Sequence, residues 1–186
     1  MRIDFIRHGK TEGNLEMRYI GRTDEPLSFA GIAELAVISY PSCGRLIASP
    51  MKRCLQTAEL IFPNTAPIVC EALRECDFGD FEGRSFRELN GDPQYQRWID
   101  SCGTMPFPNG ESPADFRTRC CSGFRQIVSG YADAESIALV VHGGTIMSIL
   151  SQFALPHRDY YDWMTDNAHG WLCEFDGTNL NNPERL

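Results

Sequence analysis

Arg-Ile-Asp-Phe-Ile-Arg-His-Gly-Lys-Thr-Glu-Gly-Asn, residues 2 to 14, is the stretch that decides the fold. Its first half, up to Ile6, is a short apolar run bounded by a glycine, which predicts a β-strand. Arg7 and His8 lie where that strand ends, and Gly9 lets backbone or ligand approach closely. Because ligands of open α/β sheets bind outside the carboxyl ends of the strands, the stretch predicts a binding site at this edge.

A second stretch repeats the arrangement near the other end of the chain. Residues 136–141 are almost continuously apolar, which is typical of a parallel strand buried on both faces. The strand ends at His142-Gly143-Gly144-Thr145, and residues 146–153 continue as a helix. Two edges of this kind in one sheet are expected to bring His8 and His142 to the same rim.

Strands and helices alternate along the rest of the chain. Apolar periodicity predicts helices over residues 29–40, 51–62, 112–131 and 159–163, two short helices within 85–101, and strands over 46–48, 67–70 and 171–175. Phe29, Ile32 and Leu60 are expected to face the core, and the polar tail 178–186 is expected to fray. This alternation predicts a three-layer α/β/α sandwich with a mostly parallel central sheet.

Length and composition bound the possibilities further. At 186 residues we expect one domain over 1–186, in which residues 84–110 form a lid or insertion over the pocket. No apolar run approaches the ~20 residues of a membrane span, and charged residues interrupt the first strand, so we expect a cytoplasmic protein. The net charge of −8 argues against nucleic acid and anionic membranes as partners. A small anionic substrate remains compatible with it.

The eight cysteines carry little information. They contain no Cys-x-x-Cys pair, and the chain has only four histidines, so no metal site is expected. Without a secretion signal, a disulfide framework is not expected either. We therefore interpret the cysteines as reduced thiols, mostly buried as small apolar side chains.

The first stretch resembles the signature of the histidine phosphatase superfamily, which includes the cofactor-dependent phosphoglycerate mutases. The matching residues are Arg7, His8, Gly9, Thr11 and Asn14. Four further blocks of that family follow in the expected order: Arg18, Gly21, Asp24, Pro26, Leu27, Ser28 and Gly31; Ser49, Arg53, Gln56, Thr57 and Ala58; Leu73, Glu75, Phe78, Gly79, Glu82 and Gly83; and His142, Gly143, Gly144 and Ile146. The resemblance implies a phosphoglycerate mutase-like fold.

The residue types fit phosphoryl transfer. A phosphate monoester carries about −1.5 to −2 charges at neutral pH, and Arg7 with Arg53 nearly balances them with planar groups that bind phosphate oxygens in pairs. A neutral imidazole can attack phosphorus and form a phosphohistidine, the role that we expect for His8. We expect His142 to donate hydrogen bonds to the transferring oxygens. No metal or other cofactor is implied.

A carboxyl group is needed to protonate the leaving oxygen. Glu75 and Glu82 flank a Phe-Gly turn, and their spacing does not tell which of them does so. The family pattern assigns the role to Glu75 and leaves Glu82 a structural partner. The expected substrate-binding residues are Asn14, Thr11, Gly21, Arg22 and Gly143.

Three functions compete. The chain is shorter than most mutases, which favours a phosphomonoesterase acting on a small phosphorylated metabolite. Within that branch the chain most resembles the α-ribazole phosphatases of cobalamin assembly, which implies α-ribazole 5'-phosphate as a substrate. The alternatives are a cofactor-dependent phosphoglycerate mutase and a non-catalytic binding domain, although such domains generally lose a core residue that this chain retains. We expect a monomer or homodimer.

Overall fold

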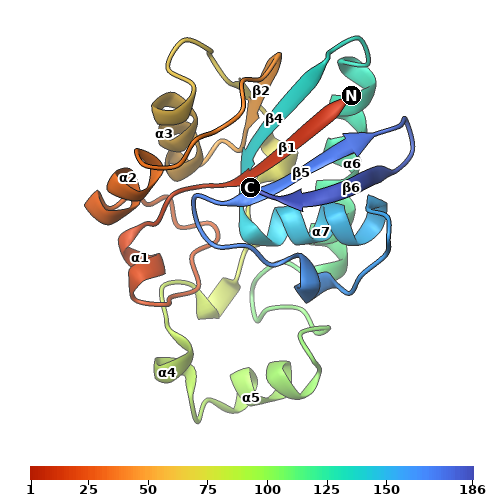
Figure 1. Cartoon of the computed structure of the whole chain (residues 1–186). Coiled ribbons are helices and arrows are strands. Elements are labelled where there is room, and N and C mark those ends of the chain that lie inside the picture. Colours follow the sequence, from red (N-terminus) through yellow and green to blue (C-terminus); the bar gives the residue numbers. More distant parts are fainter.

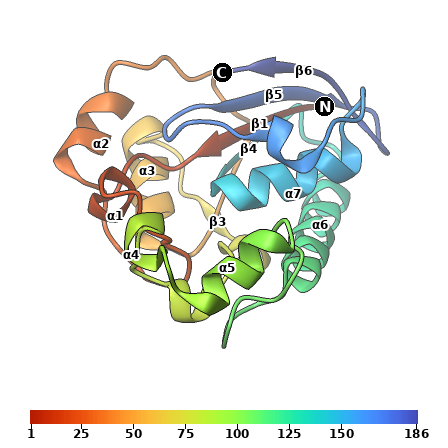
Figure 2. The same ribbon diagram turned by 90° about the horizontal axis from the view of Figure 1, so that it is seen from below.

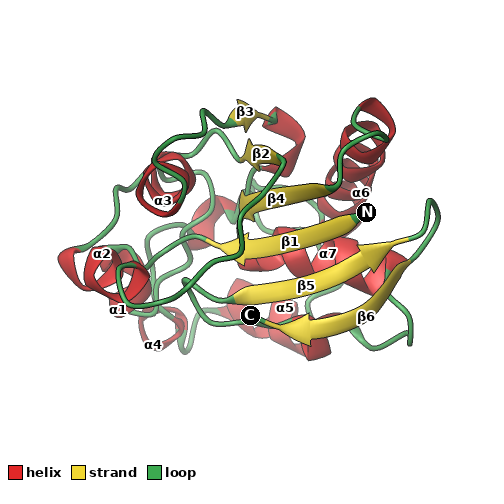
Figure 3. Cartoon of the chain, turned by 45° about the horizontal axis from the view of Figure 1, so that its top comes forward, coloured by secondary structure: helices red, strands yellow, loops and turns green.

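A six-stranded sheet organises the computed structural model, which describes residues 1–186 (Figure 1). The strands are β1 (Arg2–Arg7), β2 (Arg45–Ala48), β3 (Ile68–Val69), β4 (Ser136–Val141), β5 (Gly170–Phe175) and β6 (Leu180–Arg185), in the order β3-β2-β4-β1-β5-β6. The four strands from β3 to β1 are parallel, whereas β5 pairs antiparallel with β1 and β6 pairs antiparallel with β5. Figure 3 shows these last two strands extending the sheet beyond β1. The predicted α/β fold with a mostly parallel sheet is confirmed.

Helices cover both faces of the sheet because alternate side chains of each strand point to opposite faces. Phe5 and the strand side chains on the same face of the sheet pack with α6 (Pro113–Gly130) and α7 (Gly143–Phe153) in the largest apolar cluster. Ile6 and the strand side chains that share its face of the sheet pack with α3 (Lys52–Ile61) on the other side. Figure 2 shows α6 and α7 beside each other under the sheet. Every residue of β4 is buried, as expected for a strand covered on both faces.

The shorter elements lie mostly at the carboxyl ends of the parallel strands. They are α1 (Glu12–Leu15), α2 (Phe29–Leu35), α4 (Phe86–Leu89) and α5 (Pro93–Asp100), with 3₁₀ turns at Glu71–Leu73, Gly79–Phe81 and Tyr160–Trp163. In Figure 1, α4 and α5 stand apart from the sheet. None of the helices combines the length and apolar content that crossing a membrane requires.

The expectation of a frayed tail is wrong. Residues 180–185 form β6, which pairs with β5, and Leu180 is fully buried. The tail looked like a loop because its other side chains are polar. An edge strand, however, needs only a backbone ladder and a few buried side chains, and polar residues on its exposed side discourage further pairing.

The expectation that three apolar side chains face the core is also wrong. The helix predicted over 29–40 ends at Leu35, and Phe29 is 90% exposed. The helix packs through Leu35 and through Gly31, whose missing side chain lets the helix approach the backbone of Lys10. Ile32 and Leu60 are likewise exposed. Apolar periodicity assumes that the whole apolar stripe is covered, which is not so for these short surface helices.

Candidate active site

The two histidines meet where β1 and β4 end. These strands pair in parallel with Arg7 opposite Val141, and the His8 amide continues the ladder by donating to the Val141 carbonyl at 3.0 Å. The next side chains are therefore neighbours: the imidazole centroids of His8 and His142 lie 5.2 Å apart, and both side chains are buried. The shared rim inferred from the two strand endings is present.

His8 presents one unprotonated nitrogen. Its Nδ1 lies 2.7 Å from the Gly9 carbonyl oxygen, which can only accept, so Nδ1 carries the proton and Nε2 keeps a lone pair. Burial lowers the pKa of His8 well below its usual value, and the charges of Arg53 and Arg7 lower it further. The imidazole is therefore neutral at physiological pH.

A hydrogen bond from the end of β2 fixes the His142 side chain. Its Nε2 lies 2.7 Å from the hydroxyl oxygen of Ser49, the residue that follows this strand, and the Cys54 sulfur lies 3.5 Å away. Burial lowers the pKa of His142 well below its usual value, with further contributions from Arg53 and His8. Helix α7 begins at Gly143, so this amide belongs to a first turn whose N–H groups have no intrahelical acceptor.

Two arginines bring unsatisfied donors to the histidines. Arg7 donates through Nη1 to the Thr165 carbonyl at 2.7 Å. Arg53, which is fully buried, donates to the carbonyls of Thr23 at 2.8 Å and Gly21 at 2.9 Å. In both arginines Nε is buried without a partner. Because buried donors are nearly always paired, these two N–H groups mark a place where an anionic oxygen would fit.

Glu75 reaches the rim from the irregular segment after the Glu71–Leu73 turn. Its Oε2 accepts from the Gly144 amide at 3.2 Å, and its Oε1 accepts from the Cys76 amide at 3.0 Å. A side chain at Gly144 would overlap Glu75 Oε1, so glycine at this helix start lets the Glu75 carboxylate keep its position. Burial raises the pKa of Glu75, against the opposing effect of these two amides and of Arg53 and Arg7.

Glu82 has a different environment. Its carboxylate accepts from the amides of Gly21 at 3.0 Å and Arg22 at 2.9 Å, and from the Thr23 hydroxyl at 2.8 Å. It thereby holds the turn whose carbonyls bind Arg53. A side chain at Gly21 would overlap the Cys76 carbonyl, so the turn packs backbone against backbone.

The remaining predicted residues lie around this centre. Thr11 is buried and caps α1, while the Asn14 oxygen accepts from the Thr11 amide at 3.1 Å, which leaves the Asn14 amide group available as a donor. Arg22 turns outward: its side chain is 60% exposed and pairs with Asp77 at 3.3 Å. The structure therefore brings Arg7, His8, Arg53, Glu75, His142 and Gly143 together, with Asn14 beside them. It does not bring in the side chains of Thr11 and Arg22.

The family model described as histidine phosphatase superfamily (branch 1) matches residues 3–181. The chain belongs to this family.

Its relatives in the superfamily differ in their named activities. An adenosylcobalamin/alpha-ribazole phosphatase of Salmonella typhimurium is 26% identical over 82% of this chain and 79% of the relative. A 2,3-bisphosphoglycerate-dependent phosphoglycerate mutase 2 of Gloeobacter violaceus is 31% identical over 79% of this chain and 73% of the relative. The crystal structure of the alpha-ribazole phosphatase from Shigella flexneri has a TM-score of 0.82 at 23% identity, covering 97% of this chain and 93% of that one, which bears on the fold alone.

The candidate site opens into a cavity of about 470 Å³ whose lining is largely apolar and aromatic. Arg7, Glu75, Gly143 and Gly144 line one part of it. The apolar and aromatic lining comprises Tyr19, Cys76, Phe78, Trp98, Phe107, Pro113, Phe116, Met147, Tyr160, Tyr161 and Met164. Nowhere do three His, Cys, Asp or Glu side chains gather as metal ligands.

Sequence reasoning gave no site role to Asn167 or to Ser49, although Ser49 belongs to one of the matching family blocks. The Asn167 amide donates to the His8 carbonyl at 3.0 Å and to the Asn14 side chain at 3.3 Å. It lies before β5, in a region without a local motif, so no sequence signal pointed to it. A site role for Ser49 could have been predicted, because it follows a strand that was predicted to run parallel to the one ending at His142.

Proposed function

We propose that this chain is a metal-independent phosphomonoesterase that works through a phosphohistidine on His8. The observation that carries the proposal is the free Nε2 lone pair of a neutral, buried His8 beside two arginines with unsatisfied N–H donors. Phosphoryl transfer needs positioning and charge stabilisation more than covalent help from the protein. Arg7 and Arg53 supply the charge that Mg²⁺ supplies in kinases.

The reaction proceeds in two balanced steps. In the first step, His8 Nε2 forms a bond to phosphorus while the ester P–O bond breaks, and Glu75 gives its proton to the leaving oxygen. In the second, water attacks the phosphohistidine, Glu75 takes the proton of the water, and the P–N bond breaks to release phosphate. His142, Asn14 and the Gly143 amide donate to the oxygens that do not react. The raised pKa of Glu75 favours the protonated carboxyl that the first step requires.

The cavity supports a substrate with a flat, apolar leaving group. Aromatic walls bind planar rings by stacking and by exclusion of water. We propose residues 84–110 as a lid, since Trp98 and Phe107 of this segment form part of the wall. α-Ribazole 5'-phosphate carries such a ring system, and the Salmonella typhimurium relative is named for it. It is our first candidate substrate.

A mutase is the second candidate, since the Gloeobacter violaceus relative is named as one. A mutase acting on phosphoglycerates must hold a second anionic group besides the transferring phosphate. Beyond Arg7, the only cationic side chain lining the cavity is Arg117, and its guanidinium stacks on Tyr160. The largely apolar wall therefore favours the phosphatase.

Two measurements test the proposal. Phosphate release is followed with EDTA present for α-ribazole 5'-phosphate, 3-phosphoglycerate and p-nitrophenyl phosphate, and labelled substrate is used to trap the phosphoenzyme. We expect rapid release from the first compound and an acid-labile phosphoenzyme that His8→Asn abolishes. A label that survives His8→Asn would move the nucleophile elsewhere. Turnover of 3-phosphoglycerate only with a bisphosphoglycerate primer would establish the mutase, and silence with all compounds would favour a binding domain.

A further inference from the structure

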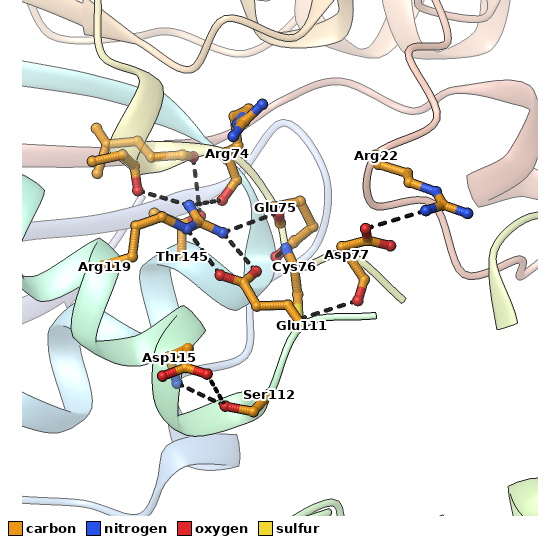
Figure 4. A network of polar contacts seen from close by, with 12 residues as sticks. Arg22, Arg74, Glu75, Cys76, Asp77, Glu111, Ser112, Asp115, Arg119 and Thr145 are labelled. Carbon is orange, nitrogen blue, oxygen red and sulfur yellow. Dashed lines mark hydrogen bonds and ion pairs between the residues drawn. The ribbon is translucent and has the colours of Figure 1, made fainter. Parts of the chain in front are cut away.

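Arg119 of α6 binds the backbone that carries Glu75. Its Nη1 donates to the carbonyl oxygens of Ala72 at 2.9 Å and Arg74 at 3.0 Å, and its Nη2 donates to the carbonyl of Glu75 at 3.4 Å. Figure 4 shows the guanidinium pointing at this segment. Residues 74–78 belong to no helix or strand, so no secondary-structure ladder fixes them. Arg119 supplies fixed N–H donors of the kind that a ladder would otherwise provide.

Glu111 completes the arrangement from the opposite side. Its carboxylate accepts from Arg119 Nε at 3.0 Å and from Nη2 at 2.7 Å, and its own amide donates to the Asp77 carbonyl at 2.9 Å. The five N–H donors of the guanidinium are thus all used, two on a carboxylate and three on backbone carbonyls. A lysine cannot reproduce this planar set.

We propose that Arg119, held by Glu111, is a positioning residue for the proton donor Glu75. The proposal rests on the proposed function, in which Glu75 protonates the leaving oxygen. The Glu75 carboxylate is otherwise aligned only by the Gly144 and Cys76 amides, and Cys76 belongs to the same irregular segment. A shift of about 1 Å at a reacting group can cost roughly 10²-fold in rate. Arg119 reaches Glu75 only through its backbone carbonyl, and the hydrogen bonds of Arg119 go to none of Arg7, His8, Arg53 and His142.

The expected effect is specific to substrates that need the proton. Arg119→Met should reduce kcat/KM for alkyl phosphates by roughly 10²-fold. Hydrolysis of p-nitrophenyl phosphate, whose leaving group needs little protonation, should fall only a few-fold. Arg119→Lys should recover little, because one ammonium group replaces five planar donors. Added guanidinium ion at millimolar concentration should partly restore alkyl phosphate hydrolysis in Arg119→Ala and not in Glu75→Gln.

Control variants separate positioning from general stability. Arg125 lies on the same helix, where it is exposed and stacks on Phe153. Arg125→Met should therefore leave both rates unchanged. Glu111→Gln keeps the shape of the pair and tests the proposal if Arg119→Met does not fold. Equal loss on both substrates, or no loss, would overturn the positioning role. If Glu75→Gln itself shows no preference between the substrates, the failure lies in the assigned role of Glu75, and the positioning role falls with it.

Discussion

Glu75 shows how one residue connects burial to the pH dependence of the reaction. Burial raises the pKa of its carboxyl, so the protonated form persists to higher pH than in an ordinary glutamate. As the pH rises through that pKa, the proton donor is lost. We therefore expect the ratio of kcat/KM for an alkyl phosphate to that for p-nitrophenyl phosphate to fall with rising pH. Taking the ratio cancels groups that affect both substrates, such as the arginines.

The same ratio in Glu75→Gln provides the control. It should be low and independent of pH, because the amide cannot donate in the same way at any pH. The profile is measured from pH 5 to 9 for both proteins. A ratio that changes with pH identically in both would assign the proton transfer to another group.

At the residue scale, strand endings predicted much of the candidate site. Arg7 is the last residue of β1, and His8 and His142 directly follow β1 and β4, so parallel pairing alone brings them together. The division of labour between Glu75 and Glu82 could not be predicted from spacing, because both are acids beside the same Phe-Gly turn. The hydrogen bonds distinguish them. The Glu82 carboxylate accepts from the amides of the Gly21 turn, whereas the Glu75 carboxylate accepts from the amide of Gly144 at the start of α7.

At the scale of elements, the turn of residues 21–23, which follows α1, is held in place by the side chain of Glu82. Glu82 accepts from the amides of Gly21 and Arg22 and from the Thr23 hydroxyl, and the same turn accepts from Arg53. Glu82→Gln removes the charge and replaces one acceptor oxygen with a donor. We expect a loss of about 2–3 kcal/mol in the free energy of unfolding, measured in urea. The KM should also rise, because Arg53 loses fixed partners.

Glu16→Gln is the matched control for this change. The Glu16 carboxylate pairs with Arg18, but it is 60% exposed. An exposed pair of this kind contributes less than about 1 kcal/mol. Similar small losses in the two variants would show that Glu82 does not organise the turn.

Across the whole molecule, sequence patterns predicted the buried strands, but they did not predict the segments that are held in place by backbone and polar contacts. β4 is apolar from Ile137 to Val141 and was recognisable on its own. β6 contains asparagines, a proline and charged residues, so its pairing with β5 depends on a neighbouring strand that no local pattern reveals. The role of the Arg119–Glu111 pair was not predicted for the same reason, since the backbone carbonyls that accept from Arg119 are distant in sequence.

Leu180 tests whether β6 stabilises the fold. Its side chain is fully buried in the main apolar cluster, and its carbonyl accepts from the Leu155 amide at 2.8 Å, which ties β6 to the end of α7. Leu180→Ala should lower the free energy of unfolding by about 2–5 kcal/mol, as expected for a buried leucine. Leu60→Ala removes the same atoms from a side chain that is 48% exposed and should cost much less. Urea unfolding followed by tryptophan fluorescence measures both. Equal small losses would mean that the edge strand frays in solution and that the sheet ends at β5, whereas the expected difference would make the polar tail a structural part of the fold.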